Sequence, residues 1–303
     1  MRQNFARVNA IGAGYYARIS IFPVRRVSKR RGAKRLPTTE VQARLNLKNS
    51  ERKLADMIHL NFTPDDDEVS LDYMNGCMPG SYKEAADGMR RFLRKLKREW
   101  AKITGREKSE FKYIVVTECS KKGRYHHHCI FTGGMTARQI HAIWERGRVT
   151  TDPLQFAENG IRGLSHYIIK QRLGYRRWMA SRNLRKPKPR QSDYRLTLRE
   201  LRYINEHPED VGYIEERFPG WKVSPNGVFC EKIASEIRGE GERTEGMPFC
   251  EVFLYREECP YYKRLPNGGI RFRFGEHFTI PDYGFPERGG EVWETDFTGV
   301  GSA

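Results

Sequence analysis

The 303-residue sequence lacks the motifs of several common protein classes. It contains no GxxxxGK[ST] phosphate loop, so nothing in this chain predicts a helicase or another ATP-driven motor. Its six cysteines include no CxxC pair, which argues against a zinc ribbon and against a dense disulfide framework. We therefore expect reduced thiols. Internal repeats are absent as well.

Long hydrophobic runs are also missing. No apolar stretch approaches the roughly 20 residues that a membrane-spanning helix needs. Residues 1–7 lack the apolar core of a signal peptide. The sequence therefore predicts a cytoplasmic protein without a membrane partner.

Positive charge is what the chain has in excess. The formal net charge is +17 and the pI is about 9.7, while 38% apolar residues suffice for a folded core. A basic chain with 15 Tyr and 5 Trp favours nucleic acid as its partner. Ten Lys/Arg and no acidic residue lie in segment 159–192, whereas acidic residues outnumber basic ones beyond residue 230.

These shifts in composition predict three parts. Residues 1–39 would be a basic N-terminal arm, because seven Lys/Arg and no acid lie in 24–36. Residues 40–225 would form the main domain, which includes the basic segment 159–192. Residues 226–303 would be an acidic, Gly-rich accessory element or a partly disordered tail.

Hydrophobic periodicity predicts an α+β fold. We expect helices at 40–60, 82–104, from Thr136 to about Gly147, and at 159–173. Strands are expected at 68–73, 111–118, 125–132 and 148–151. This mixed order favours an antiparallel central β-sheet with flanking helices over a doubly wound parallel sheet.

Three consecutive histidines inside a predicted strand mark a metal site. Side chains alternate along a strand, so His126 and His128 share one face and His127 points to the other. Two imidazoles one pleat apart can hold one divalent metal. A hairpin with the preceding strand could bring Glu118 beside them as a third ligand. A second possibility is a zinc site on the opposite face, formed by Cys119, His127 and Cys129.

A tyrosine downstream of the histidines could act as a nucleophile. Tyr167 lies at the edge of the apolar stripe of the helix predicted at 159–173, and Lys170 follows it by one turn. A phenol with a pKa near 10 needs such a cationic setting to attack a phosphodiester. Lys170 alone could also be a simple phosphate contact.

At these residues the chain resembles the HUH endonucleases, in particular the rolling-circle replication initiators of plasmids, phages and small single-stranded DNA replicons. The family's three motifs, in the initiators' order, look like Val69–Tyr73, His126–His128 and the YxxK motif Tyr167–Lys170. The resemblance extends over roughly residues 40–222. It implies an RRM-like, ferredoxin-like nuclease domain with a single catalytic tyrosine, because Gly163 and Gln171 stand where a second tyrosine would fall.

The resemblance also implies a reaction and its partners. Tyr167, assisted by Lys170, would nick and rejoin single-stranded DNA at an origin, which could form a stem-loop, through a 5′-phosphotyrosine intermediate. Mg²⁺ or Mn²⁺ would be held by Glu118, His126 and His128. A host helicase and polymerase would take part, in the cytoplasm of a bacterial cell or, for a phage-encoded protein, of its host.

Basic and aromatic side chains around these motifs are the candidates for DNA contact. Most are expected to touch the backbone rather than the bases. They are Arg124, Arg172, Arg176, Arg177, Trp178, Arg182, Lys186 and Lys188.

Two other functions fit the same residues. A relaxase or transposase would use the same chemistry, although motif order and length disfavour it. A non-catalytic nucleic-acid-binding protein could carry a structural metal. Tyr167 separates these classes, because a binding module should tolerate its replacement by Phe.

Overall fold

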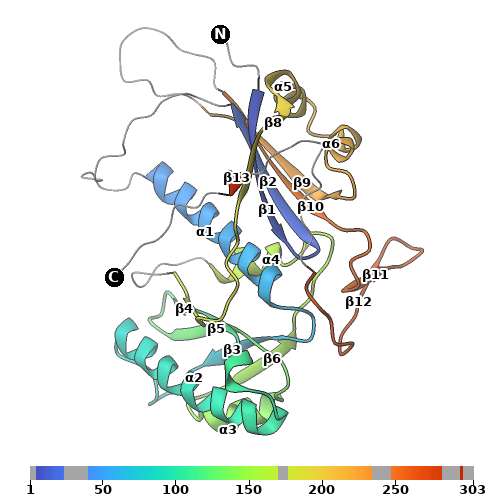
Figure 1. The fold of residues 1–303 in the computed structure, drawn as a ribbon. Helices are drawn as coiled ribbons and strands as arrows, with labels where there is room; N and C mark the ends of the chain where they lie inside the picture. The colour runs from blue at the N-terminus through green and yellow to red at the C-terminus, as the bar shows by residue number, and fades with distance from the viewer. Residues whose placement is uncertain (1–4, 24–39, 170–176, 234–246, 282–293, 296–303) are drawn as a thin grey trace. The chain divides into compact units, whose positions relative to one another are not determined.

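The fold is seen in a computed structural model that describes residues 5–23, 40–169, 177–233, 247–281 and 294–295 (Figure 1). The chain divides into two compact units. Unit 1 comprises residues 1–38, 187–259 and 281–303, and unit 2 comprises residues 39–186 and 260–280. No helix in the described part of the chain is long and apolar enough to cross a membrane.

Unit 1 is built on a six-stranded antiparallel sheet with the strand order β13-β8-β1-β2-β10-β9. Its strands are β1 (Phe5–Ala13), β2 (Tyr16–Pro23), β8 (Arg190–Thr197), β9 (Lys222–Ile233), β10 (Met247–Tyr255) and β13 (Glu294–Thr295). The helices α5 (Leu198–Glu206) and α6 (Val211–Arg217) contribute to its core. Alternate residues of the strands, such as Val8, Ile19 and Val252, pack with Leu201 and Phe218 in this core.

The units do not follow the parts expected from composition. Residues 5–23, within the expected basic arm, form the hairpin β1–β2, and β10 from the expected tail pairs with β2. Strand pairing across more than 200 positions of sequence leaves no local trace in composition. The basic run at 24–36 lies outside the described residues.

Unit 2 contains a five-stranded antiparallel sheet with the order β6-β3-β5-β4-β7. Its strands are β3 (Asp67–Asp72), β4 (Tyr113–Cys119), β5 (Tyr125–Phe131), β6 (Val149–Pro153) and β7 (Met179–Ala180). A separate small hairpin joins β11 (Tyr262–Arg264) to β12 (Ile270–Phe272). Both sheets are antiparallel and flanked by helices, which confirms the predicted α+β class.

Helices cover both faces of the unit 2 sheet (Figure 1). They are α1 (Glu40–Asn61), α2 (Tyr82–Thr104), the short 3₁₀ helix η1 (Lys108–Glu110), α3 (Ala137–Trp144) and α4 (Arg162–Ile168). The helices α2 and α3 pack on the face that carries Leu71, Val115 and Phe131. On the opposite side lie α1 and α4 (Figure 1), and α4 brings Tyr167 to the face of His128.

Local capping explains the helix boundaries. Ser81 accepts a hydrogen bond from the backbone N–H of Glu84 at the start of α2, and Gly105 ends the helix with φ 69°. Thr136 and Gln139 form a capping box at the start of α3. That helix ends earlier than expected, at Trp144, because Glu145 takes the left-handed C-cap position.

Candidate metal centre and its tyrosine

The hairpin β4–β5 places the three predicted metal ligands together. Glu118 lies directly opposite His126 in the antiparallel ladder, and Val116 lies opposite His128. The Oε2 atom of Glu118 is 3.2 Å from Nε2 of His126 and 3.8 Å from Nε2 of His128. One ligand atom from each residue lies within 4.8 Å of the others, so this cluster could hold a metal ion.

The state of Glu118 fits such an ion. Its side chain is about nine-tenths buried, and its second oxygen, Oε1, is buried without a hydrogen-bond partner in the described part of the chain. A buried acceptor that lacks a partner costs free energy, and a cation removes that cost. Imidazole nitrogens and a carboxylate together form a donor set suited to Mn²⁺ and related divalent ions.

His128 is oriented by a residue of the neighbouring strand. Ser70 on β3 lies directly opposite His128, and its Oγ is 3.4 Å from Nδ1 of that ring. The other nitrogen, Nε2, faces Glu118. A hydrogen bond on one ring nitrogen fixes the orientation and tautomer of a ligand histidine, so Ser70 positions His128.

His127 has a different role from its neighbours. It is fully buried, and its ring accepts or donates at both nitrogens, with Thr117 Oγ1 at 2.9 Å from Nδ1 and Tyr73 Oη at 2.9 Å from Nε2. Burial lowers the pKa of His127 to about 3, with smaller contributions from His126 and His128, so the ring is neutral. A neutral ring has one N–H and one lone pair, and these two hydroxyl groups satisfy both.

The alternative zinc site is not formed. Cys119, His127 and Cys129 do not form a metal-binding cluster, and both nitrogens of His127 are already engaged. Cys129 lies in the hydrophobic core, where burial raises the pKa of its thiol well above the usual value. A protonated, buried thiol is a poor zinc ligand.

Tyr167 lies beside the metal cluster. It is the residue of α4 next to Ile168, and 54% of its surface is exposed. Its ring stands edge-on to the ring of His128, with 5.6 Å between the ring centroids. The expected apolar stripe is present, because Ile161, Ile168 and Ile169 are buried. The structure thus brings together the four residues Glu118, His126, His128 and Tyr167.

A buried histidine of α1 holds the start of α4. The backbone N–H of Ile161 donates to Nε2 of His59 at 2.9 Å, and burial together with the charge of Arg162 lowers the pKa of His59 to about 3. The neutral ring can therefore accept this bond. Gly160 has φ 58°, and a Cβ at that position would lie 2.2 Å from Nε2 of His59. The contact needs a glycine there.

The expected DNA contacts are placed unevenly. Arg124 donates to Asn75 Oδ1 at 2.9 Å and to the carbonyl oxygen of Tyr73 at 2.8 Å, which ties the β4–β5 turn to the chain after β3. Arg177 and Trp178 are partly buried. The exposed residues of this set are Arg182, Lys186 and Lys188. Lys170, Arg172 and Arg176 lie outside the described residues.

Sequence reasoning missed the residues that position the site. Ser70 could have been found from strand pairing, since it lies in an alternating strand expected beside the histidines. His59 and Gly160 are 101 positions apart in the chain and carry no shared motif, so only the folded structure links them.

The comparisons with known proteins agree with this geometry. Residues 69–172 match the model of a family of replication-associated proteins, a segment that runs from β3 past α4 and includes the metal cluster and Tyr167. No curated protein and no solved structure matches the chain. The segment that carries the candidate site is therefore similar to this replication-associated protein family, which supports a role for this protein in the initiation of replication.

Proposed function

We propose that the protein is a rolling-circle replication initiator that nicks and rejoins single-stranded DNA at an origin. The observation that carries this proposal is the position of Tyr167, whose ring lies 5.6 Å from that of the predicted metal ligand His128. An exposed phenol next to a candidate metal site can reach a phosphate bound there. The family match over residues 69–172 supports DNA replication as the setting.

The reaction is a transesterification. The phenol oxygen of Tyr167 attacks phosphorus, and the bond from phosphorus to the 3′-oxygen of the preceding nucleotide breaks. The phenol proton passes to solvent and the leaving 3′-oxygen takes up a proton. The products are a 5′-phosphotyrosine and a free 3′-hydroxyl. Because the number of phosphoester bonds is unchanged, the reverse attack by a 3′-hydroxyl rejoins the strand.

The residues of the site divide this work. Glu118, His126 and His128 would hold Mg²⁺ or Mn²⁺, which when bound polarises the scissile phosphate and neutralises its charge. Ser70 keeps the ring of His128 in place. His59 holds the start of the helix that carries Tyr167. Lys170, outside the described residues, would neutralise charge on the phosphate as Tyr167 attacks.

A purely structural metal is the main rival, and the cluster argues against it. Structural sites are closed, with four protein ligands as a rule, whereas catalytic sites leave a position open. The described residues supply three ligands, and 27% of the His126 side chain is exposed. A relaxase or transposase would share the chemistry, and the replication-associated family match favours an initiator over both.

Covalent capture of the DNA tests the proposal. The full-length protein is incubated with Mn²⁺ and end-labelled single-stranded oligonucleotides that carry stem-loops from candidate origins, and the products are separated on a denaturing gel. We expect a protein–DNA adduct with the wild type and none with Tyr167→Phe. The matched control is Tyr194→Phe, which alters an exposed tyrosine of unit 1 and should leave the adduct intact.

Oligonucleotide binding is measured in parallel. Tyr167→Phe should bind almost as tightly as the wild type, because one hydroxyl adds little beside many phosphate contacts. An adduct that persists in Tyr167→Phe, or no adduct with any stem-loop substrate, would overturn the proposal.

A further inference from the structure

A cavity of about 450 Å³ lies beside α2, lined by residues that the metal centre does not use. Arg90, Arg94 and Lys97 line it from α2, where their spacing of four and three residues places them on one face of the helix. Arg182 lines it from the segment after β7. We call this cavity the α2 groove.

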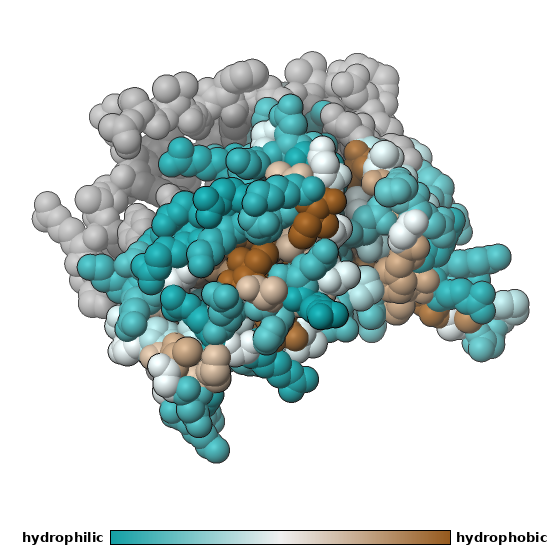
Figure 2. Space-filling model, turned by 90° about the horizontal axis from the view of Figure 1, so that it is seen from below, coloured by the Kyte–Doolittle hydropathy of each residue, from teal (hydrophilic) through white to brown (hydrophobic). Residues whose placement is uncertain are grey.

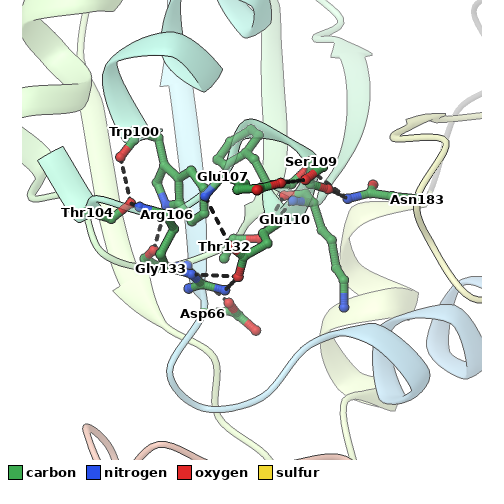
Figure 3. A network of polar contacts seen from close by, with 12 residues as sticks. Asp66, Trp100, Thr104, Arg106, Glu107, Ser109, Glu110, Thr132, Gly133 and Asn183 are labelled. Atoms are coloured by element: carbon green, nitrogen blue, oxygen red, sulfur yellow. Dashed lines mark hydrogen bonds and ion pairs between the residues drawn. The ribbon is translucent and has the colours of Figure 1, made fainter. Parts of the chain in front are cut away.

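Hydrogen bonds fix the rim of the groove on both sides of Arg182. The side-chain amide of Asn183 donates to the carbonyl oxygens of Ser109 at 2.6 Å and Phe111 at 3.2 Å, and Figure 3 shows Asn183 reaching Ser109 from its own segment. The backbone N–H of Ser181 donates to the carbonyl of Tyr113, whose own N–H donates to Ser181 Oγ. Arg182 is therefore held between two anchored neighbours.

The rest of that wall is rigid as well. Trp100 of α2 donates to the carbonyl oxygen of Gly133 at 2.8 Å, and Glu107 and Glu110 form a capping box around η1 (Figure 3). Both interactions fix segments next to the Ser109 side of the groove. The basic side chains thus stand on a preformed scaffold, which lowers the entropy cost of binding a ligand.

The groove is positively charged throughout. Its lining contains four cations and no carboxylate. Arg90 pairs with Asp87, but no carboxylate of the described residues pairs with Arg94, Lys97 or Arg182. Leu93 and Tyr113 supply an apolar wall beside these charges. Figure 2 views unit 2 from the side of α2 and α3, where the surface is mostly hydrophilic with a few hydrophobic residues enclosed among them.

This lining matches a nucleic-acid strand better than a free anion. Spaced guanidinium and ammonium groups neutralise successive phosphates. The ring of Tyr113 and the side chain of Leu93 offer a surface on which a sugar or a base can pack. An isolated inorganic anion would need only one or two of these cations and no apolar wall.

The α2 groove is separate from the metal centre. Tyr113 and Glu118 are five positions apart on β4, so they point to opposite faces of the sheet. Five residues of strand correspond to about 17 Å. A ligand in the groove therefore cannot be the phosphate that Tyr167 would attack.

We propose that the α2 groove is a second, sequence-independent binding site for the phosphodiester backbone of a single DNA strand. The identity of the strand rests on the proposed function, since the groove would hold origin DNA away from the nick. The groove itself is defined by its charge and shape.

Binding measurements without divalent metal test the groove alone. Fluorescence anisotropy follows a labelled single-stranded oligonucleotide as full-length protein is added, at several salt concentrations. The triple variant Arg94→Ala, Lys97→Ala, Arg182→Ala should bind roughly tenfold more weakly, and its plot of log K against log salt should flatten by about 2, at ~0.7 per lost phosphate contact. The matched control is Lys95→Ala with Arg98→Ala, two exposed cations of α2 outside the groove.

Three outcomes are informative. A loss of affinity and slope in the triple variant but not in the control supports the groove. Equal effects in the two variants, or none in either, overturn it. If the triple variant does not fold by circular dichroism, the single change Arg94→Ala replaces it, with an expected flattening of about 0.7.

Failure of the groove and failure of the nickase proposal give different results. If the wild type forms no adduct with any substrate yet the triple variant loses DNA binding, the groove stands and the nicking chemistry falls. If the adduct forms and depends on Tyr167 while the triple variant binds like the control, the groove falls and the chemistry stands.

Discussion

The ring of Tyr167 stands edge-on to the ring of His128, with an interplanar angle of 77° and 5.6 Å between centroids. The contact joins α4 to β5 and places a candidate nucleophile against a candidate metal ligand. It is made by the ring of Tyr167, so the ring and the hydroxyl of this residue can be tested separately.

The first prediction concerns the hydroxyl. Tyr167→Phe keeps the ring and should leave the affinity for Mn²⁺ unchanged within about twofold, because the candidate ligands are Glu118, His126 and His128. Isothermal titration calorimetry measures this affinity. As a positive control, Glu118→Gln removes the carboxylate charge and should weaken binding strongly. A tenfold loss in Tyr167→Phe would instead make the phenol oxygen a ligand.

The second prediction concerns Ser70. Replacing it with Ala removes the hydroxyl that lies 3.4 Å from His128 Nδ1 and should lower Mn²⁺ affinity by about tenfold, the low end of the range for residues that orient metal ligands. Ser70→Thr retains the hydroxyl and should rescue most of this affinity. Unchanged binding in Ser70→Ala would show that the ring of His128 is fixed by other contacts.

The third prediction compares two glycines at the start of α4. Gly160→Ala should destabilise unit 2 by about 2 kcal/mol or more, because φ is 58° and the new Cβ would collide with the ring of His59. Gly163→Ala is the matched control, since a Cβ there meets nothing within 4 Å and alanine favours a helix by up to ~1 kcal/mol. Urea denaturation gives both values. Equal stability of the two variants would contradict the close approach of His59.

The fourth prediction is a pH dependence from His59. Its pKa is about 3 in the folded protein against 6.5 ordinarily, first because it is buried and second because Arg162 is near. Between these pH values the unfolded chain binds a proton that the folded chain does not, so the stability present above pH 6.5 is lost as the pH falls. The slope is about 1.4 kcal/mol per pH unit for one such group.

Replacing the histidine isolates this slope. His59→Gln can still accept the bond from Ile161 but does not titrate, so its free energy of unfolding should fall less steeply between about pH 6 and pH 4, by about 1.4 kcal/mol per unit. His166→Gln changes an exposed histidine and serves as the control. Parallel curves for the wild type and His59→Gln would show that His59 is protonated in the folded state.

Much of unit 2 could be predicted because its signals are local. The helix 82–104 was predicted with the observed bounds, since Ser81 and Gly105 are typical residues for the two ends of a helix. The histidine strand and the strand before it were also predicted, because each is a short apolar run on either side of a turn that contains Gly123. Their register then brings Glu118 to His126.

The rest depends on contacts between distant parts of the chain. The α4 helix begins at Arg162 rather than at residue 159, because Gly160 forms a turn against His59 that no local pattern announces. The sheet of unit 1 was not predicted at all, since β1 reads as part of a basic arm and β10 as part of an acidic tail until they join β2 between them. The stripe of Arg90, Arg94 and Lys97 was visible as a basic helix, but only the anchored Arg182 turns it into a groove.

Three identical residues in a row leave a strand free to slide. If β5 slipped by one position against its neighbours, His127 would reach the metal side and His126 and His128 would turn toward the core. The hydroxyls of Thr117 and Tyr73 prevent this, because each pairs with a nitrogen of the middle ring and only one alignment satisfies both. The histidine that binds no metal thus acts as a register pin, and its loss would scramble the site without removing a single ligand.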